Sequence, residues 1–451
     1  MGTERIPKLL FSISTPIIIS MLVQALYNIV DSIFVAQYDP TGTATAALAI
    51  AFPVQNLMIA VSVGLAVGTN ALLSRSLGQK NSEKVNTIAG QGIFLTLCGY
   101  LLFLVFGLTL VPLFVGTQAD IGTTLYDNGV EYTTIISLFS IGVFVQVVSE
   151  RFLQATGKSM LSMIVQLSGA ITNIILDPIL IFGLLGCPRM GVKGAAVATV
   201  VGQAVSALLG IIMNLKFNKE IKFSLKNFIP QIKILREMLA IGIPAVLMQA
   251  ISSVMTFAMN LILTSFEQVG EVALGVFGIY FKLQSFIFMP VFGLNNGMVP
   301  IVAYNYGAGK RDRIYATMKL SVVIAVSYML LGFGTFQLFP KALLGMFNAS
   351  VQMLLIGTQA LRVISISFIM AGFSIVSISV CQALGKSIYS LIVSACRQLV
   401  VLIPAAYLLS LTGDVKNVWW AFPLAELVGC SLCITFLIHV LRTVLHKQHK
   451  N

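Results

Sequence analysis

The sequence predicts an all-α polytopic membrane protein, and three observations carry this prediction. Only 10% of the 451 residues are charged and 57% are hydrophobic, whereas a soluble protein has about 25% charged residues. The mean hydropathy is +0.94. Apolar runs of about 20 residues or more recur from end to end, each long enough to cross a hydrocarbon core as a helix. Because lipid satisfies no backbone polar group, such runs indicate helices.

Twelve transmembrane helices are expected, since the apolar runs number twelve. The first run is interpreted as a retained helix, because it lacks an A-x-A-like cleavage site and because Gln24, Asn28 and Asp31 do not suit the apolar core of a signal peptide. The predicted spans are 12–37, 48–73, 87–115, 130–152, 160–183, 194–215, 240–266, 272–300, 315–338, 354–380, 388–410 and 417–441.

The net charge of +12 is explained by membrane topology rather than by a nucleic-acid partner. Lysine and arginine fall in alternate connections, with 20 in one set and four in the other. By the positive-inside rule, the basic set faces the cytoplasm, so both termini are expected to be cytoplasmic. The lipid bilayer is therefore one predicted partner, and nucleic acid is not.

The cysteines and histidines predict no metal centre or disulfide framework. Cys187 sits alone in a predicted outer loop, and the three histidines, from His439 to His449, cluster at the C-terminal end. No nucleotide-binding loop of the Walker type occurs, so ATP is not expected to be the direct energy source. No cofactor is expected apart from a coupling ion, H⁺ or Na⁺.

The chain contains an internal repeat. The stretch "LQATGKS" (153–159) returns as "CQALGKS" (381–387), and Pro16 and Pro244 are separated by the same 228 residues. Chance similarity between apolar segments is the alternative, but the matched residues are polar ones in loops. We therefore predict two parallel six-helix repeats. The predicted parts are an N-terminal lobe 1–215, a cytoplasmic linker 216–239, a C-terminal lobe 240–441 and a cytoplasmic tail 442–451.

The two halves differ in a set of intramembrane polar residues. Carboxylates are costly in a membrane and suggest function. Asp31 and Asp177 both lie roughly 25–29 Å from the cytoplasmic ends of their helices, at 1.5 Å per residue. Side chains from three helices could thus line one cavity. The polar residues are Tyr27, Asp31, Asn173, Asp177 and Thr199, and their apolar counterparts at the 228 offset are Met255, Met259, Val401, Ala405 and Leu427.

A pair of acids in this position predicts a cation site. Two neighbouring carboxylates cannot both ionise cheaply without a cation or a shared proton. The oxygens of Asp31, Asn173, Asp177 and Thr199 are hard donors that suit Na⁺, and a proton could occupy the same place. Pro178 removes a backbone N–H, so it could let its helix bend, and it frees a carbonyl as an acceptor. A pair of structurally hydrogen-bonded aspartates is the alternative.

Four motifs carry a resemblance to a known family. "YNIVDSIFVAQ" (27–37), "QATGKS" (154–159), "NIILDPILIFG" (173–183) and "GAAVAT" (194–199) resemble the multidrug and toxic compound extrusion (MATE) family, in its DinF-like bacterial branch. The resemblance implies two six-helix lobes that form a V-shaped cavity, in the bacterial inner membrane. It also implies export of cationic or amphiphilic drugs in exchange for Na⁺ or H⁺, and hence a role in drug resistance.

The resemblance also implies roles for particular residues. The coupling cation would bind at Asp31, Asn173, Asp177 and Thr199. Pro16 could let the first helix bend when the ion binds. The NorM-like branch of the family uses acids in its seventh and tenth helices, and the corresponding predicted helices of this chain contain none. An N-lobe site is therefore expected.

The C-terminal half has intramembrane charges of its own, at Lys282, Arg362, Arg397 and Glu426. Lys282, Arg362 and Glu426 are predicted to lie at similar depth and could pair. We interpret them as a structural charge network rather than a substrate contact, since buried charges normally find partners.

Two other classes of protein are alternatives to a drug antiporter. A flippase or exporter of a lipid-linked or anionic metabolite could use the same fold, and Lys282, Arg362 and Arg397 favour it. A membrane-embedded aspartyl protease could use two aspartates, but the repeat and the whole-chain resemblance argue against an enzyme. The expected protein is a monomeric, cation-coupled antiporter for small amphiphilic cations that works by alternating access.

Overall fold

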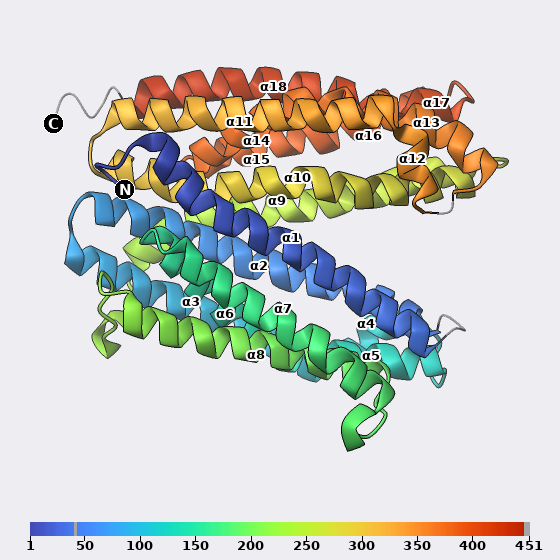
Figure 1. The fold of residues 1–451 in the computed structure, drawn as a ribbon, viewed down its shortest axis with the longest axis horizontal. Coiled ribbons are helices and arrows are strands. Elements are labelled where there is room, and N and C mark those ends of the chain that lie inside the picture. The colour runs from blue at the N-terminus through green and yellow to red at the C-terminus, as the bar shows by residue number, and fades with distance from the viewer. Residues whose placement is uncertain (40–42, 348, 446–451) are drawn as a thin grey trace. The chain divides into compact units, whose positions relative to one another are not determined.

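The computed structural model describes residues 1–39, 43–347 and 349–445, and every regular element in these residues is a helix (Figure 1). Ten helical stretches of the described residues, among them the continuous stretch 387–410, are long and apolar enough to cross a membrane. Two further pairs, each bent at a short break, pass the same test together, which gives twelve spans if each pair is one. The predicted all-α polytopic class is confirmed.

The two halves of the chain contain similar successions of helices. The first half comprises α1 (Ile6–Tyr38), α2 (Thr43–Gly78), α3 (Ser82–Thr109), α4 (Val111–Gly116), α5 (Thr124–Leu138), α6 (Ile141–Ala155), α7 (Ser159–Phe182), the 3₁₀ turn η1 (Leu184–Gly186) and α8 (Val192–Phe217). The 3₁₀ turn η2 (Leu225–Phe228) follows. The second half comprises α9 (Ile232–Thr264), α10 (Gly270–Gly307), α11 (Arg311–Leu338), α12 (Pro340–Gly345), α13 (Val351–Ser365), α14 (Ser367–Ala383), α15 (Ser387–Ala395), the π-helix η3 (Cys396–Leu402), α16 (Ile403–Ser410), α17 (Val415–Val418), α18 (Ala421–Val440) and the π-helix η4 (Leu441–Leu445). The halves differ in that α15, η3 and α16 stand in the second half where the first has the single helix α7.

The repeated motif forms the same turn in both halves. Gly157 and Gly385 follow α6 and α14 with φ of +83° and +75°, a left-handed conformation that glycine adopts without steric cost. The next residue then donates to the carbonyl five positions back, from Lys158 N to Leu153 O and from Lys386 N to Cys381 O, at 2.8 Å in each case. The repeat therefore extends from the sequence to the backbone hydrogen bonds.

The fourth and tenth predicted spans, 130–152 and 354–380, are bent rather than straight. The bend is 43° between α5 and α6 and 44° between α13 and α14. At each junction the backbone switches to shorter i→i−3 bonds, from Ser140 N to Ser137 O and from Ile366 N to Val363 O. Such 3₁₀-type bonds tighten the last turn of a helix and redirect the chain.

Several helices are longer than predicted at their charged ends. α1 begins at Ile6 rather than 12, and α9 begins at Ile232 rather than 240. The extra turns carry charged residues such as Lys8 and Arg236, which end an apolar run without ending a helix. Long basic side chains are tolerated there because they reach the membrane surface.

The chain folds into two compact units, whose boundaries differ from the predicted lobes. One unit contains 1–18 and 247–451, and the other contains 19–246. α1 therefore begins in the first unit and ends in the second, and α9 does the reverse. The predicted N-terminal lobe 1–215 and linker 216–239 do not describe this exchange, which depends on tertiary contacts.

Glycines of α2 and α10 allow the N-terminal parts of α9 and α1 to pack closely within each unit. In α2, a Cβ added at Gly68 would lie 2.3 Å from Met238 O of α9. In α10, a Cβ added at Gly297 would lie 2.8 Å from Ser14 Cα of α1, and Ser14 Oγ donates to Leu294 O at 3.3 Å. Small residues spaced by four allow helices in a membrane to approach this closely.

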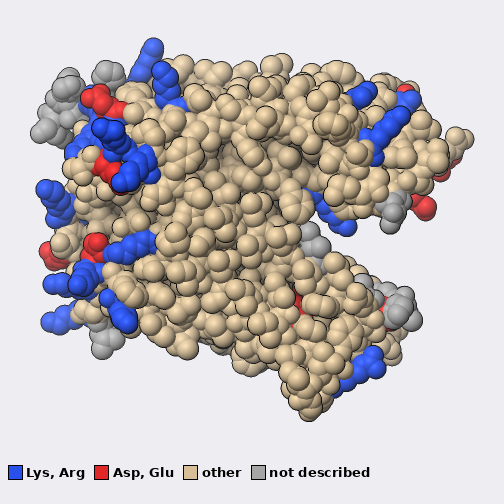
Figure 2. Space-filling view, viewed as in Figure 1, with Lys and Arg blue, Asp and Glu red and all other residues tan. Residues whose placement is uncertain are grey.

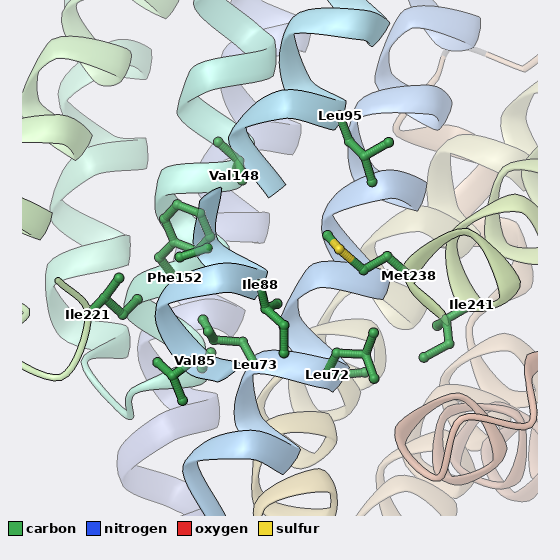
Figure 3. Packing of buried hydrophobic residues seen from close by; sticks show 13 residues of the cluster. Leu72, Leu73, Val85, Ile88, Leu95, Val148, Phe152, Ile221, Met238 and Ile241 are labelled. Atoms are coloured by element: carbon green, nitrogen blue, oxygen red, sulfur yellow. The ribbon is translucent and has the colours of Figure 1, made fainter. Parts of the chain in front are cut away.

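The predicted linker 216–239 packs against helices of the same unit. Gln91 of α3 donates from Nε2 to Asn227 O at 2.9 Å and to Ile229 O at 2.8 Å. Apolar side chains of α2, α3 and α6 pack with Ile221 and with Met238 of α9 in one buried cluster (Figure 3). Residues 446–451 of the predicted tail lie outside the described residues.

The surface has the polarity expected in lipid. Figure 2 shows broad areas without charged side chains, and large apolar side chains at helix surfaces are exposed, such as Leu102 at 61% and Phe257 at 65%. Polar side chains, by contrast, are buried within the units, including Asn173 and Asp177. This arrangement identifies a multi-pass membrane protein.

Candidate functional site

The two predicted carboxylates meet inside the unit formed by residues 19–246. Asp31 lies on α1 and Asp177 on α7, and their carboxyl groups are within hydrogen-bonding reach of each other. Asp177 is fully buried, with an exposed fraction of 0%. Asp31 and Asp177, which were expected at similar depth from the helix rise, thus lie next to each other.

Asn173 and Thr199 join this pair. Asn173 Nδ2 donates to Asp177 Oδ1 at 3.2 Å, one turn along α7, and lies 3.5 Å from Thr199 Oγ1 of α8. Both residues are buried. The structure therefore brings together all four residues that were predicted to hold a cation.

Three oxygens of this group have no hydrogen-bond donor among the described residues. They are Asp31 Oδ1, Asp177 Oδ2 and Asn173 Oδ1, and each atom is buried. A buried carboxylate oxygen is costly unless it is hydrogen-bonded, neutralised or bound to a cation. A proton or a hard cation such as Na⁺ fits this donor set chemically.

Two tyrosines complete the surroundings. Tyr27, which was predicted, lies within electrostatic range of both carboxylates. Tyr132 of α5, which was not predicted, is 2% exposed, lies within the same range of both acids and is within hydrogen-bonding reach of Thr199. Its counterpart at the 228 offset is Ala360, so the comparison of halves that singled out the acids could have found it.

The helices that carry the site approach closely because of glycines. α7 and α8 lie side by side (Figure 1). A Cβ added at Gly202 of α8 would lie 2.8 Å from Gly169 O of α7 and 3.2 Å from Asn173 Cβ. With no side chain at either glycine, the two backbones form a close-packed wall. This contact brings Thr199 within reach of Asn173.

The two prolines lie inside continuous helices. Pro178 follows Asp177 within α7, which continues to Phe182 and ends at Gly183 with φ of +76°. Pro16 lies within α1, two residues before the chain passes from one unit to the other. A bending role for either proline stays a prediction.

The charges of the C-terminal half are arranged differently from the predicted network. Glu426 of α18 pairs with Arg397 of η3, with Nη1 and Oε2 2.9 Å apart. Room for the arginine stem comes from Gly429, where a Cβ would lie 2.9 Å from Arg397 Cδ. The pair is mostly buried, since the side chain of Arg397 is 21% exposed and that of Glu426 is 9% exposed. Arg397 and Glu426 thus form an ion pair within one unit.

Lys282 and Arg362 make other contacts. Lys282 Nζ lies 5.8 Å from the ring centroid of Phe347, and Arg362 Nε donates to Gln337 O at 3.2 Å. The predicted grouping of these two residues with Glu426 was based on depth alone. Depth along a helix does not give the direction in which a side chain points. That direction places Arg397, rather than Lys282 or Arg362, next to Glu426.

Known proteins resemble this chain along nearly its whole length. The sequence model of the MatE family matches residues 16–179 and again 244–408, so the two matches follow the internal repeat. The "Multidrug export protein MepA" of Staphylococcus haemolyticus is 29% identical over 435 residues, which are 96% of this chain and 94% of that protein. The protein of the same name from a bovine strain of Staphylococcus aureus is 28% identical over 438 residues, with the same shares covered.

Solved structures share the fold. "Crystal structure of MATE in the bent conformation" superposes with a TM-score of 0.91 at 23% identity and covers 99% of this chain and 98% of that one. A MOP superfamily transporter from Pyrococcus furiosus, described as having a binding pocket of reverse polarity, superposes with a TM-score of 0.88 at 24% identity, covering 98% of this chain and 97% of that one. At these identities the likeness concerns the fold alone.

Proposed function

This chain belongs to the MatE family, and on that premise we propose that it is a multidrug efflux transporter that exports amphiphilic organic cations in exchange for H⁺ or Na⁺. The named relatives are export proteins rather than enzymes, and no catalytic residue is assigned. The proposal of cation coupling rests on one observation: Asp31 lies within hydrogen-bonding reach of the fully buried Asp177 inside one unit.

The chemistry of this pair supports cation coupling. Two adjacent carboxylates repel each other when both are charged, and one bound proton or Na⁺ removes that repulsion. Asn173 and Thr199 would complete an oxygen donor set for Na⁺, and a proton would compete for the same oxygens. The bound ion can drive a conformational change only to the extent that its affinity differs between the two conformations.

The proposed change is a bend of α1 near Pro16. A proline removes one backbone hydrogen bond of the helix, which lowers the resistance to bending. Neutralising Asp31 would alter how firmly the outer part of α1 is held against α7. In this proposal, the altered position of α1 closes the site and releases the drug. We place the protein in a bacterial inner membrane, with both termini cytoplasmic because the basic connections follow the positive-inside rule, and we propose that it acts as a monomer.

A lipid-linked or anionic substrate is less favoured. The basic residues that supported it were Lys282, Arg362 and Arg397, and Arg397 is neutralised by Glu426 at 2.9 Å. An anion-binding site needs basic groups that are not already paired. The coupling acids, in contrast, suit exchange of one cation for another.

A substrate panel tests the proposed substrate class. The purified protein in liposomes, with an imposed H⁺ or Na⁺ gradient, is expected to move amphiphilic organic cations against their gradient. Neutral and anionic analogues of the same size and hydrophobicity, which serve as matched controls, are expected to move at the rate of protein-free liposomes. Transport of the anionic analogues alone would contradict the proposal.

A further inference from the structure

A second polar contact joins α1 to α7 below the acid pair. Gln166 Nε2 of α7 donates to Gln24 Oε1 of α1 at 2.6 Å, and the contact is partly buried. A short, partly buried hydrogen bond between amide side chains in a membrane-spanning unit holds two helices in a defined register. Neither residue belongs to the candidate cation site.

The bridge is aligned with the acid site on both helices. Gln24 precedes Asp31 by seven residues, and Gln166 precedes Asn173 by seven. Seven residues are about two helical turns, so each glutamine lies on the same face as the site residue above it, about 10 Å away along the axis. The two polar contacts therefore lie along one seam between α1 and α7.

The bridge is specific to the N-terminal half, as the acids are. At the 228 offset, Gln24 corresponds to Ser252 and Gln166 to Ser394. These side chains are shorter, and the Ser252 hydroxyl donates to Met248 O of its own helix at 3.3 Å. A bridge needed only to pack two helices would have no reason to follow the acids into one half of a repeated fold.

The two sides of the seam differ in how they are held. α7 is clamped to α8 at Gly169 and Gly202, where backbone atoms leave no room for a Cβ. Gly169 lies between Gln166 and Asn173 in α7, so both polar levels of α7 flank this close-packed contact with α8. α1 meets that wall through Gln24 and Asp31, and it is one of the two helices that pass from one unit to the other.

We propose that the hydrogen bond between Gln24 and Gln166 is a positioning contact that holds α1 against the α7–α8 wall and so presents Asp31 to Asp177 for cation binding. This inference rests on the proposed function, because it concerns the same cation site. When a binding-competent arrangement is only partly populated, the apparent affinity falls by that fraction. Loss of the bridge therefore weakens cation binding while every ligand atom remains.

The test uses the purified full-length protein and two probes. Na⁺ binding is measured by calorimetry at pH 8, and protonation is followed in Na⁺-free buffer by the infrared carboxyl band that Asp177→Asn abolishes. Gln24→Leu and Gln166→Leu are each expected to weaken binding of whichever cation the wild-type protein takes by about fivefold, the worth of one net hydrogen bond. The double variant is expected to be no worse than either single variant, because both remove the same contact.

The controls separate this inference from the proposed function. Ser252→Ala and Ser394→Ala remove the counterparts in the other half and are expected to leave both readouts unchanged. Cation binding within twofold of wild type in both glutamine variants, or effects of the two variants that add, would overturn the inference while Asp177→Asn still abolishes binding. If the wild-type protein shows no Asp177-dependent binding of either cation, the proposed function fails, and the inference fails with it.

Discussion

Asp31→Asn and Asp177→Asn are each expected to reduce energy-coupled efflux to the level of cells that lack the transporter. Asparagine keeps the volume and an acceptor oxygen, but it cannot carry the charge that a proton or Na⁺ neutralises. Asp177 is fully buried and accepts a hydrogen bond from Asn173, so the substitution removes ionisation with little change in packing. Accumulation of an exported dye in cells measures the loss, and the amount of protein in the membrane verifies folding.

The matched control for these variants is Met259→Leu. Met259 is the counterpart of Asp31 in the other half and is fully buried. A swap between apolar side chains of similar volume typically costs less than about 1.5 kcal/mol, so efflux is expected to remain near wild type. Normal efflux by either aspartate variant would mean that the pair is a structural hydrogen bond and not the coupling site.

Gly202→Ala is expected to lower both stability and efflux. The added Cβ would lie 2.8 Å from Gly169 O and 3.2 Å from Asn173 Cβ, and the first of these atoms belongs to the backbone and cannot rotate away. Overpacking of this kind costs about 1–3 kcal/mol, and the wall formed by α7 and α8 must open to relieve it. Thr199 then moves away from Asn173, so cation binding is expected to weaken together with the thermal midpoint.

The matched control for Gly202→Ala is an alanine at a helical glycine that has free space around it. Gly334 lies within α11, and a Cβ added there would meet no atom within 4 Å. Gly334→Ala is expected to leave efflux unchanged and to raise the thermal midpoint slightly, since alanine favours the helix by about 1 kcal/mol. Equal thermal midpoints for Gly202→Ala and the wild-type protein would show that the close contact of α7 and α8 does not support the site.

The helical class and the number of spans could be predicted because lipid leaves the backbone no alternative to helices. The internal repeat could be predicted because its polar turn, with Gly157 and Gly385 in the left-handed conformation, needs the same residues in both halves. The bends and the longer helix ends could not, because apolar runs report where charge begins and not where backbone hydrogen bonding stops or changes.

The exchange of helix ends between the units was not predictable from hydropathy. The first turns of α1 pack on Gly293 and Gly297, and those of α9 pack on Gly64 and Gly68. The sequence shows these glycines, but it does not show which helix packs on each pair, since a helix of either half could do so. The choice is made by tertiary packing.

The candidate site was predicted in large part from the difference between the halves. Asp31, Asn173, Asp177 and Thr199 meet as expected, because an acid in lipid must find partners. Tyr132 was missed, although its replacement by Ala360 was the same kind of signal. The pairing of Glu426 with Arg397 was missed because depth along a helix does not give the direction of a side chain.

The most direct test of a shared cation site is Na⁺ binding to the purified protein across a range of pH. Na⁺ affinity is expected to weaken as pH falls, because protons compete for the oxygens of Asp31 and Asp177. Asp177→Asn is expected to remove this binding together with its pH dependence. Equal Na⁺ affinity across the titration range, or Na⁺ binding that survives Asp177→Asn, would show that the two ions do not share this site.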